Sequence, residues 1–201
     1  MKIVFASNND GKIRELKAML ADFNLIAIPQ SDLGVAEIPE TGLTFVENAL
    51  IKARHASQIT GLPAIADDSG LAVSALQGAP GIYSARYAGD KAKPEDNIKK
   101  LLAALQDVPT SERLACYYCV LVYMTHAEDP TPLICHGVWH GSILTIAQGN
   151  QGFGYDPIFF DATENKSAAE LPLDIKNRLS HRGQALRLLM KNLSEKIAGN
   201  D

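Results

Sequence analysis

The prediction of the fold starts from the stretch Pro63-Ala64-Ile65-Ala66-Asp67-Asp68-Ser69-Gly70-Leu71. A short apolar run leads into two adjacent carboxylates and two turn-forming residues, which indicates a buried strand that ends at a turn. Ligands of open α/β sheets bind beyond the carboxyl ends of their strands, so the carboxylates are expected at the edge of a binding site. Adjacent carboxylates repel one another unless a cation or hydrogen-bond donors offset the repulsion. Magnesium suits such a pair, and a solvated Asp-Asp-Ser-Gly turn is the alternative.

The composition indicates a globular protein: 46% of the 201 residues are hydrophobic and 21% are charged. A net charge of −4 without a basic tract gives no electrostatic support for binding a nucleic-acid backbone, whereas a few local cations suffice for a nucleotide. No apolar stretch reaches the roughly 18 residues that a membrane span needs, and no signal peptide is evident. Three cysteines, an odd number, argue against a disulfide framework, so a cytoplasmic location is expected.

Cys116-Tyr117-Tyr118-Cys119 matches the C-x-x-C pattern but lies in a strand-like run over residues 113–124. Side chains three apart on a strand point to opposite faces, so the two sulfurs are not expected to meet. We therefore interpret both cysteines as packing residues rather than as a redox or metal pair.

A strand over residues 2–6, a polar loop over residues 7–12 and a helix from Ile13 are expected at the start of the chain. This order presents free N–H groups and the positive end of a helix dipole to an anion, and Lys12 adds a full charge. A Walker A loop is the obvious rival, but Ala6 stands where it needs its first glycine and Ile13 where it needs Ser or Thr. An ordinary capped loop is the other alternative.

Strand and helix patterns alternate in the first part of the chain, and an antiparallel block follows. Thr44-Phe45-Val46-Glu47 fits a capping box for a helix that ends at Gly61. Two strands, about 113–125 and 132–140, flank a hairpin loop. The sequence therefore predicts an α/β protein with a mixed sheet, in two lobes with a cleft between them.

Five motifs occur in order: Ser7-Asn8-Asn9-Asp10-Gly11-Lys12, Glu40-Thr41-Gly42, Asp67-Asp68-Ser69-Gly70-Leu71, Phe153-Gly154-Tyr155-Asp156-Pro157 and Ser180-His181-Arg182-Gly183. Together they resemble the inosine triphosphatase family, the XTP/dITP pyrophosphatases that clear non-standard purine nucleotides, and especially its bacterial members. The resemblance spans nearly the whole chain.

The resemblance implies one domain over residues 1–201, with an elongated two-lobed fold around a long mixed sheet and flanking helices. It also implies a homodimer that uses Mg2+ to hydrolyse ITP, dITP and XTP to the monophosphate and pyrophosphate. The residues implied to bind substrate are Ser7, Asn8, Asn9, Asp10, Gly11, Lys12, Ser69, Phe153, Gly154, Tyr155, Asp156, Lys176, His181 and Arg182. Glu40 and Asp68 are implied to bind the metal, and Asp68 and Lys12 to be catalytic.

The residues themselves fit this chemistry. Transfer at phosphorus depends mostly on positioning and electrostatics, which Lys12 and a helix N-terminus supply. Asp68 is expected to act as the base with a metal contact, supported by Asp67. Donors such as Lys176, His181 and Arg182 can donate to the C6 oxygen of hypoxanthine or xanthine but are left unpaired by the amino group of adenine. A nucleotide-binding regulatory module without turnover and a P-loop kinase or phosphatase are the rival interpretations.

Overall fold

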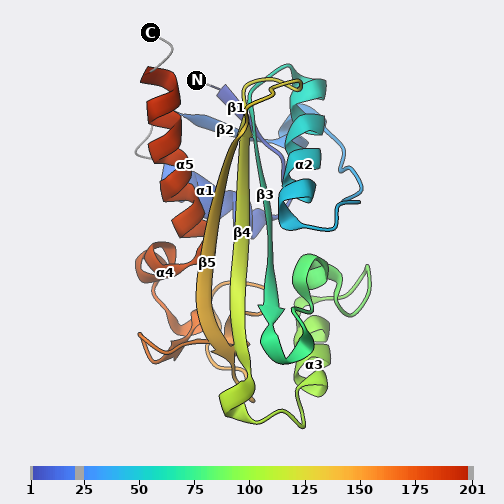
Figure 1. Cartoon of the computed structure of the whole chain (residues 1–201), viewed down its shortest axis with the longest axis vertical. Helices are drawn as coiled ribbons and strands as arrows, with labels where there is room; N and C mark the ends of the chain where they lie inside the picture. Colours follow the sequence, from blue (N-terminus) through green and yellow to red (C-terminus); the bar gives the residue numbers. More distant parts are fainter. Residues whose placement is uncertain (1, 21–24, 199–201) are drawn as a thin grey trace. The chain divides into compact units, whose positions relative to one another are not determined.

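The computed structural model describes residues 2–20 and 25–198. Within these residues the strands form one open, seven-stranded sheet in the order β2-β1-β3-β4-β5-β6-β7 (Figure 1). The strands are β1 (Lys2–Phe5), β2 (Ile26–Pro29), β3 (Ala64–Val73), β4 (Leu114–Met124), β5 (Leu133–Ile143), β6 (Phe159–Asp161) and β7 (Lys166–Ser167). The helices are α1 (Asp10–Leu20), α2 (Phe45–Thr60), α3 (Pro94–Ala104), α4 (Leu173–Leu179) and α5 (His181–Ala198). Strand β1 is parallel to β2 and β3, whereas β6 is antiparallel to β5 and β7, so the predicted mixed α/β sheet is confirmed.

The chain divides into two compact units. The first unit contains residues 1–68, 119–137 and 182–201, and the second contains residues 69–118 and 138–181. Strands β3, β4 and β5 each contribute residues to both units. Two of the four boundaries, between Asp68 and Ser69 and between His181 and Arg182, fall within motifs that the sequence singles out.

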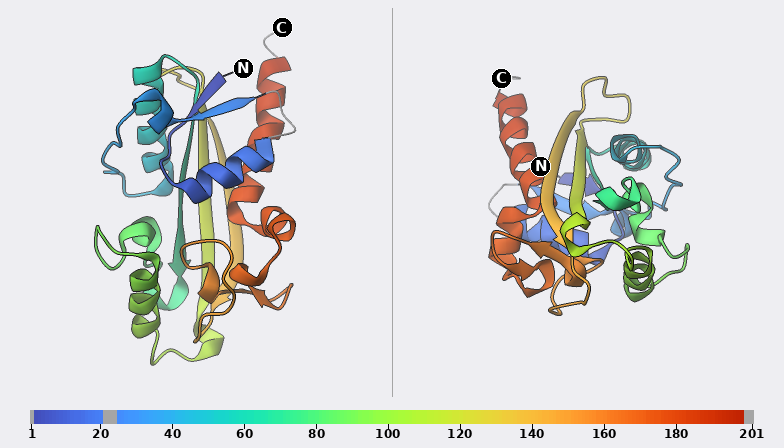
Figure 2. Two further views of the ribbon diagram at one scale, coloured as in Figure 1. Left: turned by 180° about the vertical axis from the view of Figure 1, so that it is seen from behind. Right: turned by 60° about the horizontal axis from the view of Figure 1, so that its bottom comes forward.

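In the first unit, helices pack on both faces of the strands (Figures 1 and 2). Alternate strand residues, among them Phe5, Ile65 and Leu121, share a buried cluster with α1 and α5. Neighbouring residues such as Ala66 and Val122 share another with the alanine-rich face of α2. Because side chains on a strand alternate between faces, two consecutive residues of β3 must face different helices. This alternation separates the surroundings of Asp67 from those of Asp68.

In the second unit, α3 and the later strands enclose an aromatic core. The ring of Tyr117 lies 4.6 Å from that of Phe159 and 6.3 Å from that of Trp139, measured between centroids. Leu71 and Val73 from the second half of β3 are buried in the same core. Such packing gives the positions around Tyr117 little room to rearrange.

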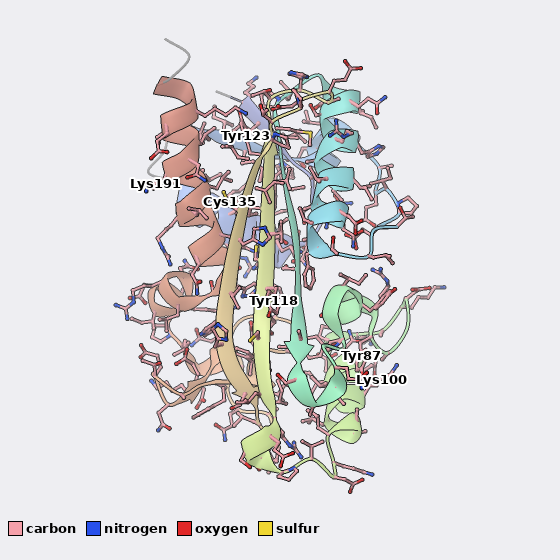
Figure 3. The ribbon with its side chains drawn as sticks, viewed as in Figure 1. Tyr87, Lys100, Tyr118, Tyr123, Cys135 and Lys191 are labelled. Carbon is pink, nitrogen blue, oxygen red and sulfur yellow. The ribbon has the colours of Figure 1, made fainter. Side chains whose placement is uncertain are left out.

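The Gly-rich segment 77–92 packs onto α3 of the same unit. Lys100 of α3 lies over the ring of Tyr87, with its Nζ 4.5 Å from the ring centroid, and donates a 2.6 Å hydrogen bond to the Tyr87 carbonyl (Figure 3). The Asn97 side chain accepts from Ala88 N at 2.7 Å and donates to the Ala85 carbonyl at 3.1 Å. These contacts fix the backbone of a segment that is otherwise rich in glycine.

Two predicted boundaries are wrong. Strand β3 runs through Ser69 and Gly70 to Val73 instead of ending in a turn, because Leu71 and Val73 are apolar and bury their side chains in the second unit. Helix α1 begins at Asp10 rather than at Ile13, because the Asn9 side chain accepts a 3.0 Å hydrogen bond from Lys12 N, as an N-cap residue does.

Other local predictions are confirmed. The Thr44 side chain caps α2 by accepting from Glu47 N, and the helix ends at Gly61 with a left-handed φ of 67°. The hairpin between β4 and β5 spans the expected loop. None of the helices in the described ranges has the length and apolarity that crossing a membrane requires.

Candidate active site

Asp67 lies at the centre of a buried charge cluster in the first unit. Its carboxylate forms an ion pair with Lys12 of α1 and accepts a 2.9 Å hydrogen bond from Arg182 Nε of α5. Arg182 also pairs with Glu15, and the Cys119 thiol donates to Asp67 Oδ2 at 3.2 Å. Burial raises the pKa of Asp67, but the charges of Arg182 and Lys12 outweigh burial and hold this pKa well below its usual range. Asp67 is therefore an anion that orients two cations.

Asp68 faces α2 and has a different partner. The ammonium group of Lys52 donates to Asp68 Oδ1 and to Glu40 Oε1, each at 2.7 Å. Burial raises the pKa of Asp68 above its ordinary value against the opposing effect of Lys52, and the negative charge of Glu40 raises it further. Burial lowers the pKa of Lys52, but Asp68 and Glu40 overcome this effect and leave the pKa raised. Two carboxylates thus converge on one cation.

Lys52 is absent from the residues that the motifs single out. The sequence gives only a weak signal for it: Asn48, Lys52 and Ala56 are spaced four apart and so share one side of α2. The structure shows that Asn48 and Ala56 are buried there. A lysine on the buried stripe of a helix needs an acidic partner.

The start of α1 is organised by its own side chains. Asn9 N donates to Ser7 Oγ at 3.2 Å, and Asn8 Nδ2 donates to Glu37 Oε1 at 3.0 Å. Lys12 lies in the first turn, where backbone N–H groups have no partner within the helix. The helix start and Lys12 together form a cationic group that suits phosphate oxygens.

In the second unit, Asp156 is the shared acceptor of three groups. Lys176 Nζ and Phe153 N each donate to Asp156 Oδ2 at 2.8 Å, and Tyr117 Oη donates to Oδ1 at 3.4 Å. Lys176 Nζ lies 5.2 Å from the centroid of the Phe153 ring. His181 is buried in the same unit, with its ring stacked on that of Tyr117.

Three further residues predicted to bind substrate are Gly154, Tyr155 and Ser69. Gly154 adopts a left-handed φ of 63° in the turn before the short helix at residues 156–158. Tyr155 is buried, and its hydroxyl donates to the Ser84 carbonyl at 2.8 Å. Ser69 is half-buried and continues β3 into the second unit.

The predicted site residues thus form one group in each unit. Lys12, Glu40, Asp68 and Arg182 belong to the first unit. So do Asp67, which the sequence predicts as the support of Asp68, and Lys52, which the structure adds. The second group consists of Phe153, Asp156, Lys176 and His181. That both groups surround one ligand stays a prediction.

The carboxylates of Glu40 and Asp68 suit a divalent cation that also contacts a substrate. In the part of the chain that the structure describes, no group of three or more His, Cys, Asp or Glu side chains is placed to enclose a metal. Glu40 and Asp68, however, both contact the Lys52 ammonium, so their oxygens already converge on a positive charge. Magnesium is commonly held by one or two carboxylates together with substrate phosphates, so the pair fits this ion.

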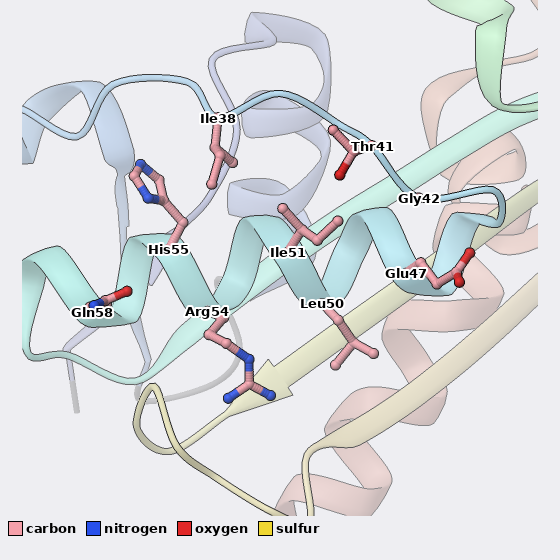
Figure 4. A pocket seen from close by; sticks show the side chains of 9 residues that line it. All are labelled: Ile38, Thr41, Gly42, Glu47, Leu50, Ile51, Arg54, His55 and Gln58. Carbon is pink, nitrogen blue, oxygen red and sulfur yellow. The ribbon is translucent and has the colours of Figure 1, made fainter.

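A separate groove of about 580 Å³ runs between α2 and residues 38–42 (Figure 4). Its lining residues are Ile38, Thr41, Gly42, Glu47, Leu50, Ile51, Arg54, His55 and Gln58. None of the charged side chains that contact Asp67 or Asp68 lines it. The groove is therefore distinct from the charge clusters.

Comparison with known proteins identifies the family. The Ham1 family matches residues 3–192 of the chain. The chain belongs to the Ham1 family. It is 60% identical over 192 residues to the dITP/XTP pyrophosphatase of Salmonella paratyphi A, a match that covers 96% of this chain and 98% of the relative. The dITP/XTP pyrophosphatase of Escherichia coli strain K12 is 59% identical with the same coverage.

Solved structures of Ham1-family proteins agree with this fold. A HAM1 protein from Coxiella burnetii superimposes with a TM-score of 0.90 at 51% identity and covers 97% of this chain and 99% of its own. The nucleoside-triphosphatase / dITP/XTP pyrophosphatase of Mycobacterium abscessus gives a TM-score of 0.75 at 43% identity, covering 94% and 98%. The family resemblance expected from the five motifs is confirmed.

Proposed function

We propose that this chain hydrolyses the non-standard purine nucleotides dITP, XTP and ITP to the monophosphate and pyrophosphate. Its curated relatives near 60% identity are dITP/XTP pyrophosphatases. The observation that carries the proposal is the pair Glu40 and Asp68 on one ammonium group, in the unit where α1 presents Lys12. Acidic ligands, a fixed cation and a helix start are the groups that pyrophosphate release requires.

The triphosphate binds at the start of α1 in this proposal. Backbone N–H groups of the first turn and the Ser7, Asn8 and Asn9 side chains donate to its oxygens, and Lys12 neutralises charge on the leaving pyrophosphate. The ion pair with Asp67 fixes the position of Lys12. The Lys12 ammonium group therefore needs little reorganisation when negative charge develops on the leaving pyrophosphate.

Asp68 is the base that accepts a proton from the attacking water. A raised pKa brings a carboxylate closer to the range in which proton acceptance is efficient. Glu40 and Asp68 would hold Mg2+, which when bound neutralises phosphate oxygens and lowers the pKa of a coordinated water. Lys52 donates to both carboxylates and orients them.

The second group recognises the base. Phe153 offers a ring on which a purine stacks. Lys176 and His181 supply donors to the C6 oxygen, and Asp156 holds Lys176 and the Phe153 backbone in position. Adenine carries an amino group at C6 and leaves these donors unpaired, which disfavours ATP.

We further propose that the protein is a cytoplasmic homodimer. Sedimentation equilibrium should then give twice the 21.7 kDa mass of one chain. A mass equal to one chain at micromolar concentration would contradict the dimer without affecting the proposed reaction.

A nucleotide panel with separate detection of pyrophosphate and orthophosphate tests the function. We expect pyrophosphate from ITP, dITP and XTP, with kcat/KM for ATP lower by about 100-fold or more. Guanine shares the C6 oxygen, so slow turnover of GTP, which we also expect, requires exclusion at its 2-amino group. Orthophosphate as the product would indicate a phosphatase of another class. Tight ITP binding in magnesium without turnover would favour a regulatory module.

A further inference from the structure

We propose that Tyr117 is a positioning residue for base recognition, an inference that rests on the proposed function. It contacts two members of the base-binding group that lie far apart in the sequence, His181 and Asp156. All three residues belong to the second unit. No motif singles out Tyr117, since the sequence around it matches only a C-x-x-C pattern in a strand.

The contact with His181 is a parallel stack. The ring centroids of Tyr117 and His181 are 4.6 Å apart, and their planes differ by 9°. An imidazole donates through N–H groups that lie in the plane of its ring. A stacking partner that fixes this plane therefore fixes the direction in which His181 donates to a ligand.

The contact with Asp156 comes from the other end of the same side chain. Tyr117 Oη donates to Asp156 Oδ1 at 3.4 Å, while Oδ2 of that carboxylate is shared by Lys176 and Phe153 N. Tyr117 therefore restrains the carboxylate on the side opposite to its two other partners. The hydrogen bond is the weaker of the two restraints, because a distance of 3.4 Å is long for a hydroxyl donor.

The Tyr117 ring is itself held on its remaining sides. The ring centroid of Phe159 lies 4.6 Å from that of Tyr117, with an angle of 47° between the ring planes. The ring centroid of Trp139 lies 6.3 Å from it, with an angle of 25° between the planes. Trp139 is anchored by a 2.6 Å hydrogen bond from its indole Nε1 to Asp161. Tyr117 is only 7% exposed, so its ring has no open side into which it can rotate.

This arrangement predicts a role in selectivity as well as in affinity. Discrimination between the C6 oxygen and the C6 amino group depends on donors that cannot turn away from the wrong base. If the His181 ring rotates freely, it no longer penalises adenine. Removal of the Tyr117 ring should therefore reduce the preference for ITP over ATP.

Two variants of Tyr117 and one control separate this role from packing. Tyr117→Phe keeps the stack and loses the hydroxyl, whereas Tyr117→Leu keeps an apolar side chain and loses the ring. Leu101→Ala removes a buried side chain on α3 from the same core and is the control for packing. We expect Tyr117→Leu to lower the ratio of kcat/KM for ITP to that for ATP by about 10-fold or more, and Tyr117→Phe to stay within about 3-fold of the unaltered protein.

Leu101→Ala should lower the melting temperature as Tyr117→Leu does while keeping the ITP-to-ATP ratio. An equal loss of selectivity in Leu101→Ala, or an unchanged ratio in Tyr117→Leu, would overturn the proposal. Loss of selectivity in Tyr117→Phe would transfer the role from the stack to the hydroxyl and would likewise overturn it.

A spectroscopic measurement tests the geometry without turnover. The ring protons of His181, assigned by their loss in His181→Asn, should show an upfield ring-current shift that persists in Tyr117→Phe and disappears in Tyr117→Leu. A His181 resonance that is indifferent to Tyr117→Leu would refute the stack. Failure of the unaltered protein to release pyrophosphate from ITP would refute the proposed function instead, and the spectrum would still decide the position of Tyr117.

Discussion

Asp67 and Asp68 are covalent neighbours with opposite electrostatic surroundings. The strand turns Asp67 toward Lys12 and Arg182 and turns Asp68 toward Lys52 and α2. The pKa of the first is lowered and that of the second is raised. Pairs of acidic groups whose pKa values are pushed apart often divide the work of a site, one staying ionised and the other exchanging a proton. The ion pairs of Asp67 indicate a structural role, and Asp68 is the residue that we propose for proton transfer.

Asp68→Asn should keep the fold and lose most turnover. The amide is nearly isosteric with the carboxylate but cannot accept a proton, so we expect kcat for ITP to fall by about 100-fold or more. Steady-state kinetics with pyrophosphate detection measures this change, and circular dichroism controls for folding. Normal ITP hydrolysis by this variant would rule out Asp68 as the base.

Asp67→Asn should act on stability and on KM together. It leaves Lys12 with a neutral partner and the buried Arg182 paired with Glu15, which costs about 3 kcal/mol of the free energy of unfolding. The less constrained Lys12 should also raise KM for ITP. Urea denaturation and kinetics measure both effects, and Asp174→Asn at an exposed carboxylate is the matched control. Unchanged stability would show that the Asp67 cluster contributes nothing to folding.

Secondary structure elements that carry their own end signals could be predicted from the sequence. The capping residues of α2 are all within a few positions of its ends, and Thr44 and Gly61 behave as expected. The end of β3 could not be read in this way, because Ser69 and Gly70 favour turns locally while Leu71 and Val73 bury their side chains in a distant core. Tertiary packing overrides the local preference there.

The β4–β5 hairpin is closed by one carboxylate whose ionisation should be visible in the pH dependence of stability. Asp129 accepts from the backbone N–H groups of Thr125 and Thr131 at 2.9 and 2.8 Å and lies 3.6 Å from Lys196 Nζ. Burial raises the pKa of Asp129, but these hydrogen bonds outweigh burial and lower it.

A lowered native pKa stabilises the fold above the unfolded-state value of about 3.9, and this contribution is lost as the pH falls. Asp129→Asn should therefore cost about 2 kcal/mol at pH 7, and progressively less between about pH 5 and pH 2. Chemical denaturation across this range measures the difference. A difference between the two proteins that is constant with pH would contradict the assignment.

At the scale of the whole molecule, the family could be predicted from the sequence, but the contacts that hold the predicted site residues could not. Motif residues such as Lys12, Asp68 and His181 lie in recognisable local patterns. Lys52 and Tyr117 lie in an ordinary helix and an ordinary strand, and their roles come from partners 16 and 64 positions away. Long-range pairing of this kind leaves little trace in a single sequence.

The three cysteines give a further prediction for the whole chain. Cys116, Cys119 and Cys135 are free thiols, and only Cys116 is not buried. Burial and the charge of Asp67 raise the pKa of Cys119 well above its usual value, and burial raises that of Cys135. An aromatic disulfide reagent should titrate about one thiol in the native protein and all of them after denaturation. Fast reaction of all the thiols in the native protein would show that the buried pair is accessible.

Lys52 has a consequence for the order in which ligands arrive. The acidic pair comes with its own internal counter-ion, since the ammonium already compensates Glu40 and Asp68. A free metal ion must compete with that lysine for the same oxygens, whereas a metal that arrives with a nucleotide brings phosphate charge to which the lysine can turn. Calorimetry should therefore detect saturable magnesium uptake only when a non-hydrolysable ITP analogue is present, and Lys52→Gln should bind the bare ion more readily.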